Sequence, residues 1–207
     1  MRILIVDDHA MVREGLKRIL ASELTNASFG EAANTTEALA QLLEKPWEIV
    51  LLDVSMRGRS GLELLKEIRA STSKTPVLVL SAHPEEQYAL RALKGGAAGY
   101  LTKESVSQEL CRAVRKVCSG GKYITPTLAE QLAAEVQSPG RPAHESLSNR
   151  EYQVMLLIAA GKVPKEIGDE LSLSPKTVGT YRTRVLEKLK LKNNAEIMRY
   201  VMERGLS

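Results

Sequence analysis

Short apolar runs alternate with amphipathic segments along the first part of the chain. The apolar runs lie at residues 3–6, 27–32, 49–52, 77–80 and 98–101, and the run at 27–32 is the weakest. Between them, apolar positions recur at helical spacing near residues 10–23, 35–44, 61–70, 85–94 and 106–118. Because the runs are continuous rather than alternating, they predict parallel strands that helices cover on both faces. The pattern therefore predicts a doubly wound α/β domain with a five-stranded parallel sheet over residues 1–120.

The pattern changes after residue 120. A further helix is expected at residues 126–136, followed by QSPGRPAHES at 137–146, where two prolines and a glycine indicate a flexible linker. We assign residues 121–146 to this helix and linker. Four helices are then expected, one between the capping box Ser148–Glu151 and Gly161, and others at 165–171, 175–191 and 194–204. They predict a small all-α domain over residues 147–207.

The composition is that of an ordinary folded protein, with 43% apolar and 26% charged residues. No apolar run approaches the roughly 18 residues of a membrane span, and MRILIVDDHA is too short and too acidic for a signal peptide. We therefore expect a cytoplasmic protein without membrane insertion. Cys111 and Cys118 lie about two turns apart on one predicted helix. Because that spacing suits neither a disulfide nor a metal pair, we expect two free thiols.

Carboxylates follow two of the predicted strands at the point where each strand ends. Asp7 and Asp8 come directly after the first apolar run, and Asp53 follows the third. Because the carboxyl ends of parallel strands share one edge of the sheet, the three carboxylates are expected to converge and to repel one another. Hard oxygen ligands suit Mg²⁺, which we expect as the cofactor. Ser81 follows the fourth run and Lys103 the fifth, on the same edge.

This set of side chains suits phosphoryl transfer. Asp53 is the candidate nucleophile, which attacks phosphorus and becomes an acyl phosphate. We expect Lys103 to pair with the added charge and Ser81 to donate a hydrogen bond to a phosphoryl oxygen. Taken singly, an Asp after a strand is more often a turn former. The joint placement of these side chains on one edge favours the functional interpretation.

The stretches VDDH, LLDVSM…G, LSAH and GYLTK resemble the receiver domain of two-component response regulators, a flavodoxin-like fold, over about residues 1–120. The resemblance implies that Asp53 accepts phosphate from a sensor histidine kinase. It implies that Mg²⁺ is bound by Asp7, Asp8, Asp53 and the backbone carbonyl of Ser55. It also implies a switch pair, Ser81 and Tyr100, in which the hydroxyl moves toward the phosphate and the aromatic ring turns inward behind it.

Ser55 and His83 match positions that tune the lifetime of the acyl phosphate in that family. From the residues alone, Tyr100 is otherwise a plain strand aromatic, and His83 is equally a solvated loop histidine. The chain departs from the family where Arg57 follows Met56, because proline is usual there. We expect a looser loop, an added cation and a changed rate or lifetime of phosphorylation. No role is evident for His9 or His144.

Positive charge gathers near the end of the chain. Residues 1–120 hold 16 Lys and Arg against 15 Asp and Glu, whereas residues 172–192 hold six against one. In this segment Val178, Tyr181 and Val185 lie on one helical stripe and indicate a core face. With the short helix and turn before it, the segment predicts a helix-turn-helix whose second helix enters the major groove of DNA. The alternative is a solvated basic helix in a small bundle.

The segment LSNREYQVMLLIAAGK…KEIGDELSLSPKTVGTYRTRVLEKLKLKN resembles the LuxR-type DNA-binding domain. Together with the receiver domain, it implies a NarL/FixJ-type transcriptional regulator. The expected DNA contacts are Lys165, Lys176, Thr177, Thr180, Arg182, Thr183, Arg184 and Lys188. Two departures from the family are Gly179, where a long side chain is common, and Tyr181, where His is usual. Base reading is then expected to rest on Thr180 and Thr183, helped by DNA shape and dimer spacing.

The sequence thus predicts a transcription factor that phosphorylation at Asp53 shifts to a homodimer on a two-fold promoter site, with RNA polymerase as a further expected partner. Ile197, Tyr200 and Val201 either form part of the dimer contact or pack against their own domain. One alternative is a constitutive DNA-binding protein whose receiver only dimerises. Another is a phosphohydrolase of the haloacid dehalogenase type, whose nucleophile would follow the first strand instead. Beyond self-phosphorylation and self-dephosphorylation at Asp53, no enzyme activity is expected.

Overall fold

The computed structural model describes residues 1–56, 60–71, 74–137 and 142–206 of the chain. Arg57, at which the sequence departs from the receiver pattern, lies outside the described residues. The chain divides into two compact units, Met1–Gln131 and Leu132–Ser207. Within the described ranges, no helix has the length and the apolar character that crossing a membrane requires.

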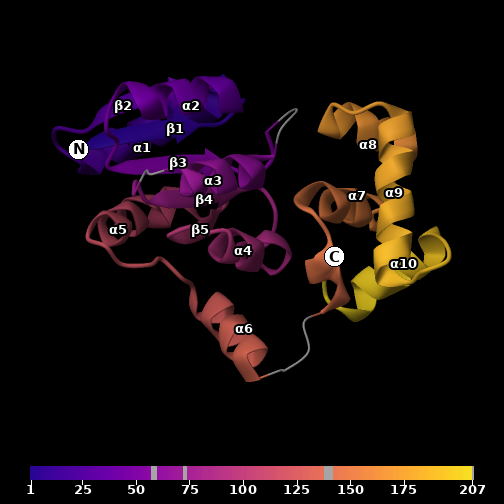
Figure 1. The fold of residues 1–207 in the computed structure, drawn as a ribbon. Helices are drawn as coiled ribbons and strands as arrows, with labels where there is room; N and C mark the ends of the chain where they lie inside the picture. The colour runs from indigo at the N-terminus through magenta and orange to yellow at the C-terminus, as the bar shows by residue number, and fades with distance from the viewer. Residues whose placement is uncertain (57–59, 72–73, 138–141, 207) are drawn as a thin grey trace. The chain divides into compact units, whose positions relative to one another are not determined.

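The first unit contains a five-stranded sheet in the order β2-β1-β3-β4-β5, and every neighbouring pair of strands is parallel (Figure 1). The strands are β1 (Arg2–Val6), β2 (Ser28–Ala32), β3 (Ile49–Asp53), β4 (Val77–Ser81) and β5 (Gly99–Thr102). Strands β3 and β4 are buried along their whole length. This burial on both faces explains their continuous apolar runs and confirms the predicted fold class.

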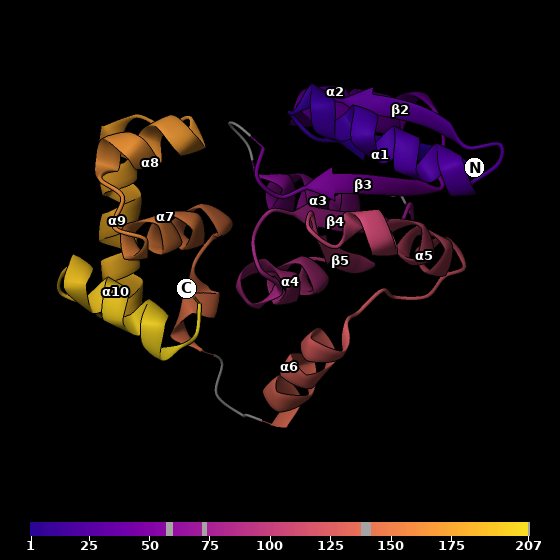
Figure 2. The same cartoon turned by 180° about the vertical axis from the view of Figure 1, so that it is seen from behind.

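Helices follow each strand, as the pattern of apolar positions predicts. They are α1 (Ala10–Glu23), α2 (Thr35–Glu44), α3 (Gly61–Ala70), α4 (Glu85–Lys94) and α5 (Val106–Cys118). Leu16 and Leu20 of α1 and Leu110 and Val114 of α5 share one buried apolar cluster with residues from the sheet. These two helices lie together on one face of the sheet, nearest the viewer in Figure 2. A sixth helix, α6 (Pro126–Gln137), begins in the first unit and ends in the second.

Among the described residues of the second unit, all the regular elements are helical. Its elements are the 3₁₀ turn η1 (Ala143–Ser146) and the helices α7 (Asn149–Ala159), α8 (Pro164–Leu171), α9 (Pro175–Leu189) and α10 (Asn194–Glu203). The capping box at α7 is present as expected, since Ser148 and Glu151 each accept a hydrogen bond from the other's backbone N–H.

Part of the segment expected to be a flexible linker forms regular structure. Ala143–Ser146 forms η1, and the backbone N–H of His144 donates to the Tyr200 hydroxyl at 3.3 Å. The His144 Nδ1 atom lies 3.0 Å from the same hydroxyl. The sequence assigned no role to His144, but these contacts hold η1 against α10.

Candidate functional site

The acidic pocket lies where β1 and β3 end. One ligand atom each from Asp7, Asp8, His9 and Asp53 lies within 4.8 Å of all the others. The register explains the meeting, because Val6 of β1 pairs with Leu52 of β3, so that Asp7 and Asp53 follow at the same height. Asp7 and Asp53 are buried, with 1% and 2% of their surface exposed. An acidic cluster of this kind is able to bind a metal ion.

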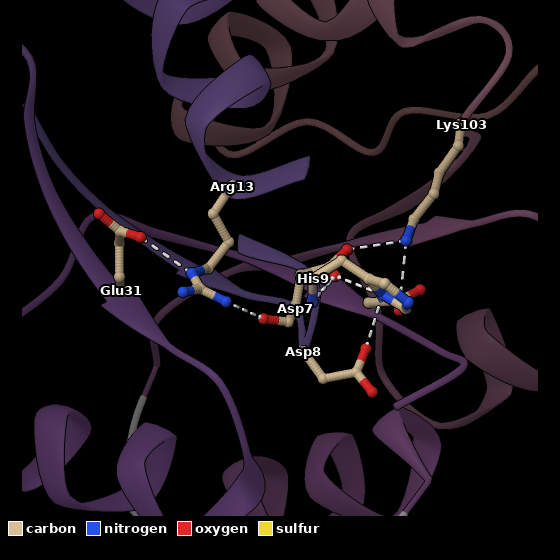
Figure 3. A network of polar contacts seen from close by, with 7 residues as sticks. Asp7, Asp8, His9, Arg13, Glu31 and Lys103 are labelled. Carbon is tan, nitrogen blue, oxygen red and sulfur yellow. Dashed lines mark hydrogen bonds and ion pairs between the residues drawn. The ribbon is translucent and has the colours of Figure 1, made fainter. Parts of the chain in front are cut away.

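Lys103 links two of these carboxylates. Its Nζ atom lies 2.7 Å from Asp7 Oδ2 and 3.2 Å from Asp53 Oδ2, as Figure 3 shows for the first contact. The backbone N–H of Lys103 donates to the carbonyl of Ser81 at 2.7 Å, which holds the residue at the end of the sheet. Burial by itself lowers the pKa of Lys103, but the Asp53 and Asp7 carboxylates outweigh it and raise that pKa above its ordinary value.

Asp53 is the least satisfied carboxylate of the pocket. Within the described residues, neither of its oxygens accepts a hydrogen bond of good geometry. Desolvation raises the pKa of Asp53 above its ordinary value, the charge of Asp7 adds to that rise, and Lys103 opposes it. A buried, poorly satisfied carboxylate suits a ligand or a reaction partner that brings positive charge or hydrogen-bond donors.

His9 is a pocket residue that the sequence interpretation missed. Its Nδ1 atom lies 2.8 Å from Asp8 Oδ1 and 3.3 Å from Asp7 Oδ1, and its backbone N–H donates to Asp7 Oδ1 at 2.8 Å (Figure 3). The available signal was its position directly after Asp7 and Asp8, at the end of the same strand.

Arg13 supports the pocket from α1. Its guanidinium donates to the backbone carbonyl of Asp7 at 2.7 Å and to Glu31 of β2 at 2.8 Å (Figure 3). This contact holds the main chain that carries Asp7 and Asp8. No sequence signal joins Arg13 to Glu31, because the two residues lie 18 positions apart on different elements.

The other expected pocket residues lie in or beside β4 and β5. Ser81 is fully buried, and its hydroxyl accepts a hydrogen bond from the backbone N–H of His83 at 3.0 Å. Tyr100 is also fully buried, and its hydroxyl donates to the carbonyl of His83 at 2.9 Å. The Tyr100 ring therefore lies inside, held by the loop that follows Ser81. The centroid of the His83 ring lies 4.8 Å from the centroid of the Tyr88 ring. Ser55, which follows β3, has a buried hydroxyl with no hydrogen-bond partner among the described residues.

The helix-turn-helix is formed by α8 and α9. Ser172 takes a left-handed conformation with φ 55°, and the N–H of Leu173 donates to the Gly168 carbonyl at 2.8 Å, which closes the turn. Val178 and Val185 of α9 are buried, as the apolar stripe predicts, and so is Leu189, whereas Tyr181 of the same stripe is only half-buried. The opposite side carries the exposed residues Lys176, Thr180, Thr183 and Arg184, and Lys165 is exposed on α8.

Two of the expected DNA contacts are held inside their own unit. Lys188 Nζ lies 2.6 Å from Glu151, whose side chain is buried, and it also reaches the Ser146 carbonyl at 3.3 Å. Arg182 Nε donates to Asn194 Oδ1 at 2.6 Å. Removing Lys188 would leave Glu151 buried without its partner charge, so this expected DNA contact also has a role inside its own unit.

The sequence left two roles open for the apolar residues of α10, a dimer contact or packing within their own domain. Ile197 and Val201 are 0% and 1% exposed, so they pack against their own unit, which was the second alternative. Tyr200 is engaged by His144. Met202 is 72% exposed and is the large apolar side chain that this helix presents at the surface.

Comparisons with known proteins match both units. The family model described as "Response regulator receiver domain" matches residues 3–115, and "Bacterial regulatory proteins, luxR family" matches residues 145–201. Response regulator UvrY of Escherichia coli K12 is 37% identical over all of this chain and 95% of its own length. Response regulator GacA of Pseudomonas aeruginosa is 36% identical over all of this chain and 97% of its own length. Salmonella RcsB, solved on the promoter rprA with the phosphomimetic BeF₃⁻, has a TM-score of 0.64 at 21% identity over 98% of each chain.

Proposed function

Because this chain belongs to the response regulators that have a receiver domain and a LuxR-type DNA-binding domain, we propose that phosphorylation of Asp53 controls its binding to DNA. The observation that carries the proposal is the pocket at the end of β3, where Asp53 is buried 3.2 Å from Lys103. The phosphoryl donor would be a sensor histidine kinase, and the target a two-fold promoter site bound by a dimer.

The residues of the pocket fit a divalent cation. Asp53 has two buried oxygens without well-aligned donors among the described residues, and Asp7 and Asp8 bring further hard oxygen ligands. We propose Mg²⁺ as the ion, held by Asp7, Asp8, Asp53 and the backbone carbonyl of Ser55. Such an ion would neutralise the carboxylates and hold a phosphoryl oxygen.

The proposed reaction leaves the phosphoryl group on Asp53. One Asp53 carboxylate oxygen attacks phosphorus, the bond between phosphorus and the donor atom breaks, and an acyl phosphate forms. With a phosphohistidine donor, the imidazole nitrogen leaves and takes a proton from water. Lys103 would then pair with the phosphoryl charge, and the Ser81 hydroxyl would donate to a phosphoryl oxygen.

Phosphorylation of Asp53 would alter the rest of the receiver through the loop that follows β4. At present Ser81 accepts the N–H of His83, and Tyr100 donates to the carbonyl of the same residue. Turning the Ser81 hydroxyl toward a phosphate would change the first contact and leave Tyr100 to hold the loop. We propose Ser81 and Tyr100 as the switch pair, and Ser55 and His83 as residues that would influence hydrolysis of the acyl phosphate.

The fold of RcsB supports DNA as the partner, since that protein has been solved on promoter DNA and as dimers on DNA. For this chain, the exposed cations Lys165, Lys176 and Arg184 would bind phosphates, while Thr180 and Thr183 would face the bases.

The test is the intact mass of the protein after incubation with acetyl phosphate and Mg²⁺. One phosphoryl adduct is expected on the wild type, labile to hydroxylamine, with acetate as the other product. Asp53→Asn should form none. Glu44→Gln, which alters an exposed carboxyl group of α2, should form the adduct as the wild type does.

The same samples are then titrated with DNA. Tighter binding after phosphorylation is expected for the wild type, and no change for Asp53→Asn. A wild-type protein that forms no adduct, or one whose DNA affinity is equal with and without the adduct, would contradict control by Asp53.

A further inference from the structure

The threonine hydroxyl groups of α9 all lie within hydrogen-bonding distance of groups of the same helix or its N-cap. The Thr180 hydroxyl donates to the carbonyl of Lys176 at 3.2 Å, and the Thr183 hydroxyl donates to the carbonyl of Gly179 at 3.1 Å. At the start of the helix, the Thr177 and Ser174 hydroxyls lie 2.8 Å apart, and Ser174 accepts the Thr177 N–H. Each threonine of this helix therefore uses its hydroxyl within the helix.

This use of the hydroxyls limits how the helix is able to read bases. A threonine hydroxyl has one hydrogen to donate. In Thr180 and Thr183 that hydrogen is already donated to the backbone four residues earlier. Neither side chain then has a donor for the N7, O6 or O4 acceptors that mark purines and thymine in the major groove. What remains for direct contact is the methyl group of each threonine and the acceptor lone pairs of its oxygen, and only the methyl group matches thymine, which presents no donor in the major groove.

The neighbouring positions leave those methyl groups accessible. Thr180 and Thr183 are three residues apart, so they are neighbours on the helix surface. Gly179 adds no side chain beside them, and a Cβ atom placed there would meet nothing within 4 Å. Lys176 and Arg184, both exposed, lie on the same helix and would bind phosphates rather than bases.

Thymine is the base that offers a matching group. Its 5-methyl group projects into the major groove, and contact with an apolar side chain, including a threonine methyl, is one of the ways in which it is recognised. We propose that Thr180 and Thr183 read thymine through its 5-methyl group by apolar contact. This inference rests on the proposed function as a DNA-binding protein and specifies which chemical group of the base it reads.

The experiment uses the full chain, phosphorylated with acetyl phosphate. A library of random-sequence duplexes is enriched on the protein, and one retained duplex is synthesised twice, with thymine and with uracil in its place. The wild type should bind the uracil duplex about fourfold more weakly for each lost methyl contact, which is the affinity equivalent of one buried methyl group.

Two double variants separate the methyl from the hydroxyl. T180S with T183S keeps the hydroxyls and removes the methyls, so this variant should bind the two duplexes alike. T180V with T183V keeps a methyl at each position and removes the hydroxyl, so it should retain the preference for thymine. Comparing both variants on both duplexes removes any effect of uracil on DNA shape, because that effect is common to all proteins tested.

The outcomes distinguish this inference from the proposed function. Equal wild-type affinity for the two duplexes would overturn the methyl contact while leaving DNA binding intact, and so would a full thymine preference in T180S with T183S. A protein that retains no duplex from the library at any concentration tested would overturn DNA binding itself, and the methyl contact with it.

Discussion

Asp53 lies in a position that favours chemistry over stability. Its carboxylate is desolvated at the end of β3, beside Asp7, and receives compensation mainly from Lys103. Such groups are common at functional sites, where a residue that destabilises the fold is kept for its reactivity. The removal of this charge should therefore stabilise the receiver when no cation is bound.

Asp53→Asn is expected to raise the free energy of unfolding by about 1 kcal/mol at neutral pH in the presence of a chelator. The pKa of Asp53 is raised above its ordinary value of 3.8, so the folded state holds its proton to a higher pH than the unfolded state does. The wild type then loses stability as the pH rises through the pKa of Asp53 in the folded state, whereas the variant has no carboxyl group to titrate at this position. The advantage of the variant should shrink as the pH falls below that value.

Urea unfolding followed by the fluorescence of Trp47 measures this effect, because Trp47 is the single tryptophan and is buried in the receiver. Glu44→Gln, an exposed change in the same unit, should stay within about 0.5 kcal/mol of the wild type. A lower unfolding midpoint for Asp53→Asn at pH 7 would show that the Lys103 ion pair outweighs desolvation.

At the scale of elements, the second unit depends on the turn between α8 and α9. Gly168 lies in α8, where an added Cβ atom would come within 2.5 Å of the Leu173 carbonyl. That carbonyl belongs to the backbone of the turn and has little freedom to move. Gly179, by contrast, has open space around it in the middle of α9. The same substitution is therefore expected to have opposite effects at the two positions.

Gly168→Ala should destabilise the helix-turn-helix by about 1–3 kcal/mol, because overpacking forces the backbone apart. Gly179→Ala should stabilise α9 by up to about 1 kcal/mol, because alanine has the higher helix propensity. Amide hydrogen exchange in peptides from α8 and α9 of the full chain measures both effects. Faster exchange in both variants, or in neither, would contradict the assignment of the turn.

At the scale of the whole chain, a hydrogen bond joins the segment after β4 to the residue directly before α6. The loop after β4 carries His83, which contacts both Ser81 and Tyr100. Two residues later, Glu85 accepts a hydrogen bond of 2.6 Å from the Thr125 hydroxyl, directly before α6. The Thr125 hydroxyl also accepts the N–H of Leu128 in the first turn of α6. A movement of this loop would therefore act on the start of α6.

Thr125→Val should leave the phosphoryl adduct at Asp53 unchanged and reduce the gain in DNA affinity on phosphorylation by about fivefold, the lower range of coupling between distant sites. Thr125→Ser keeps the hydroxyl and should behave as the wild type. Thr127→Val alters an exposed threonine in the same turn and is the matched control. The measurement is DNA affinity with and without acetyl phosphate, and an undiminished gain in Thr125→Val would exclude this route.

The sequence by itself determined the elements and the acidic edge of the sheet. Continuous apolar runs that alternate with segments of helical periodicity specify buried parallel strands between covering helices. The reason is that the spacing of apolar residues along an element decides whether one face or both faces are buried. The same spacing placed Asp7, Asp8 and Asp53 after strands that end together. The motifs around them and in α9 were sufficient to indicate both domains of the family.

Only the tertiary structure decided the partners of the side chains. Arg13 with Glu31, Lys188 with Glu151 and Thr125 with Glu85 join residues 18, 37 and 40 positions apart, and no periodicity connects them. The same holds for the burial of Ile197 and Val201, which spacing on α10 allowed to face either inward or toward a partner. Periodicity specifies which face of an element is apolar, whereas an ion pair depends on the distance between elements, and that distance is set by packing.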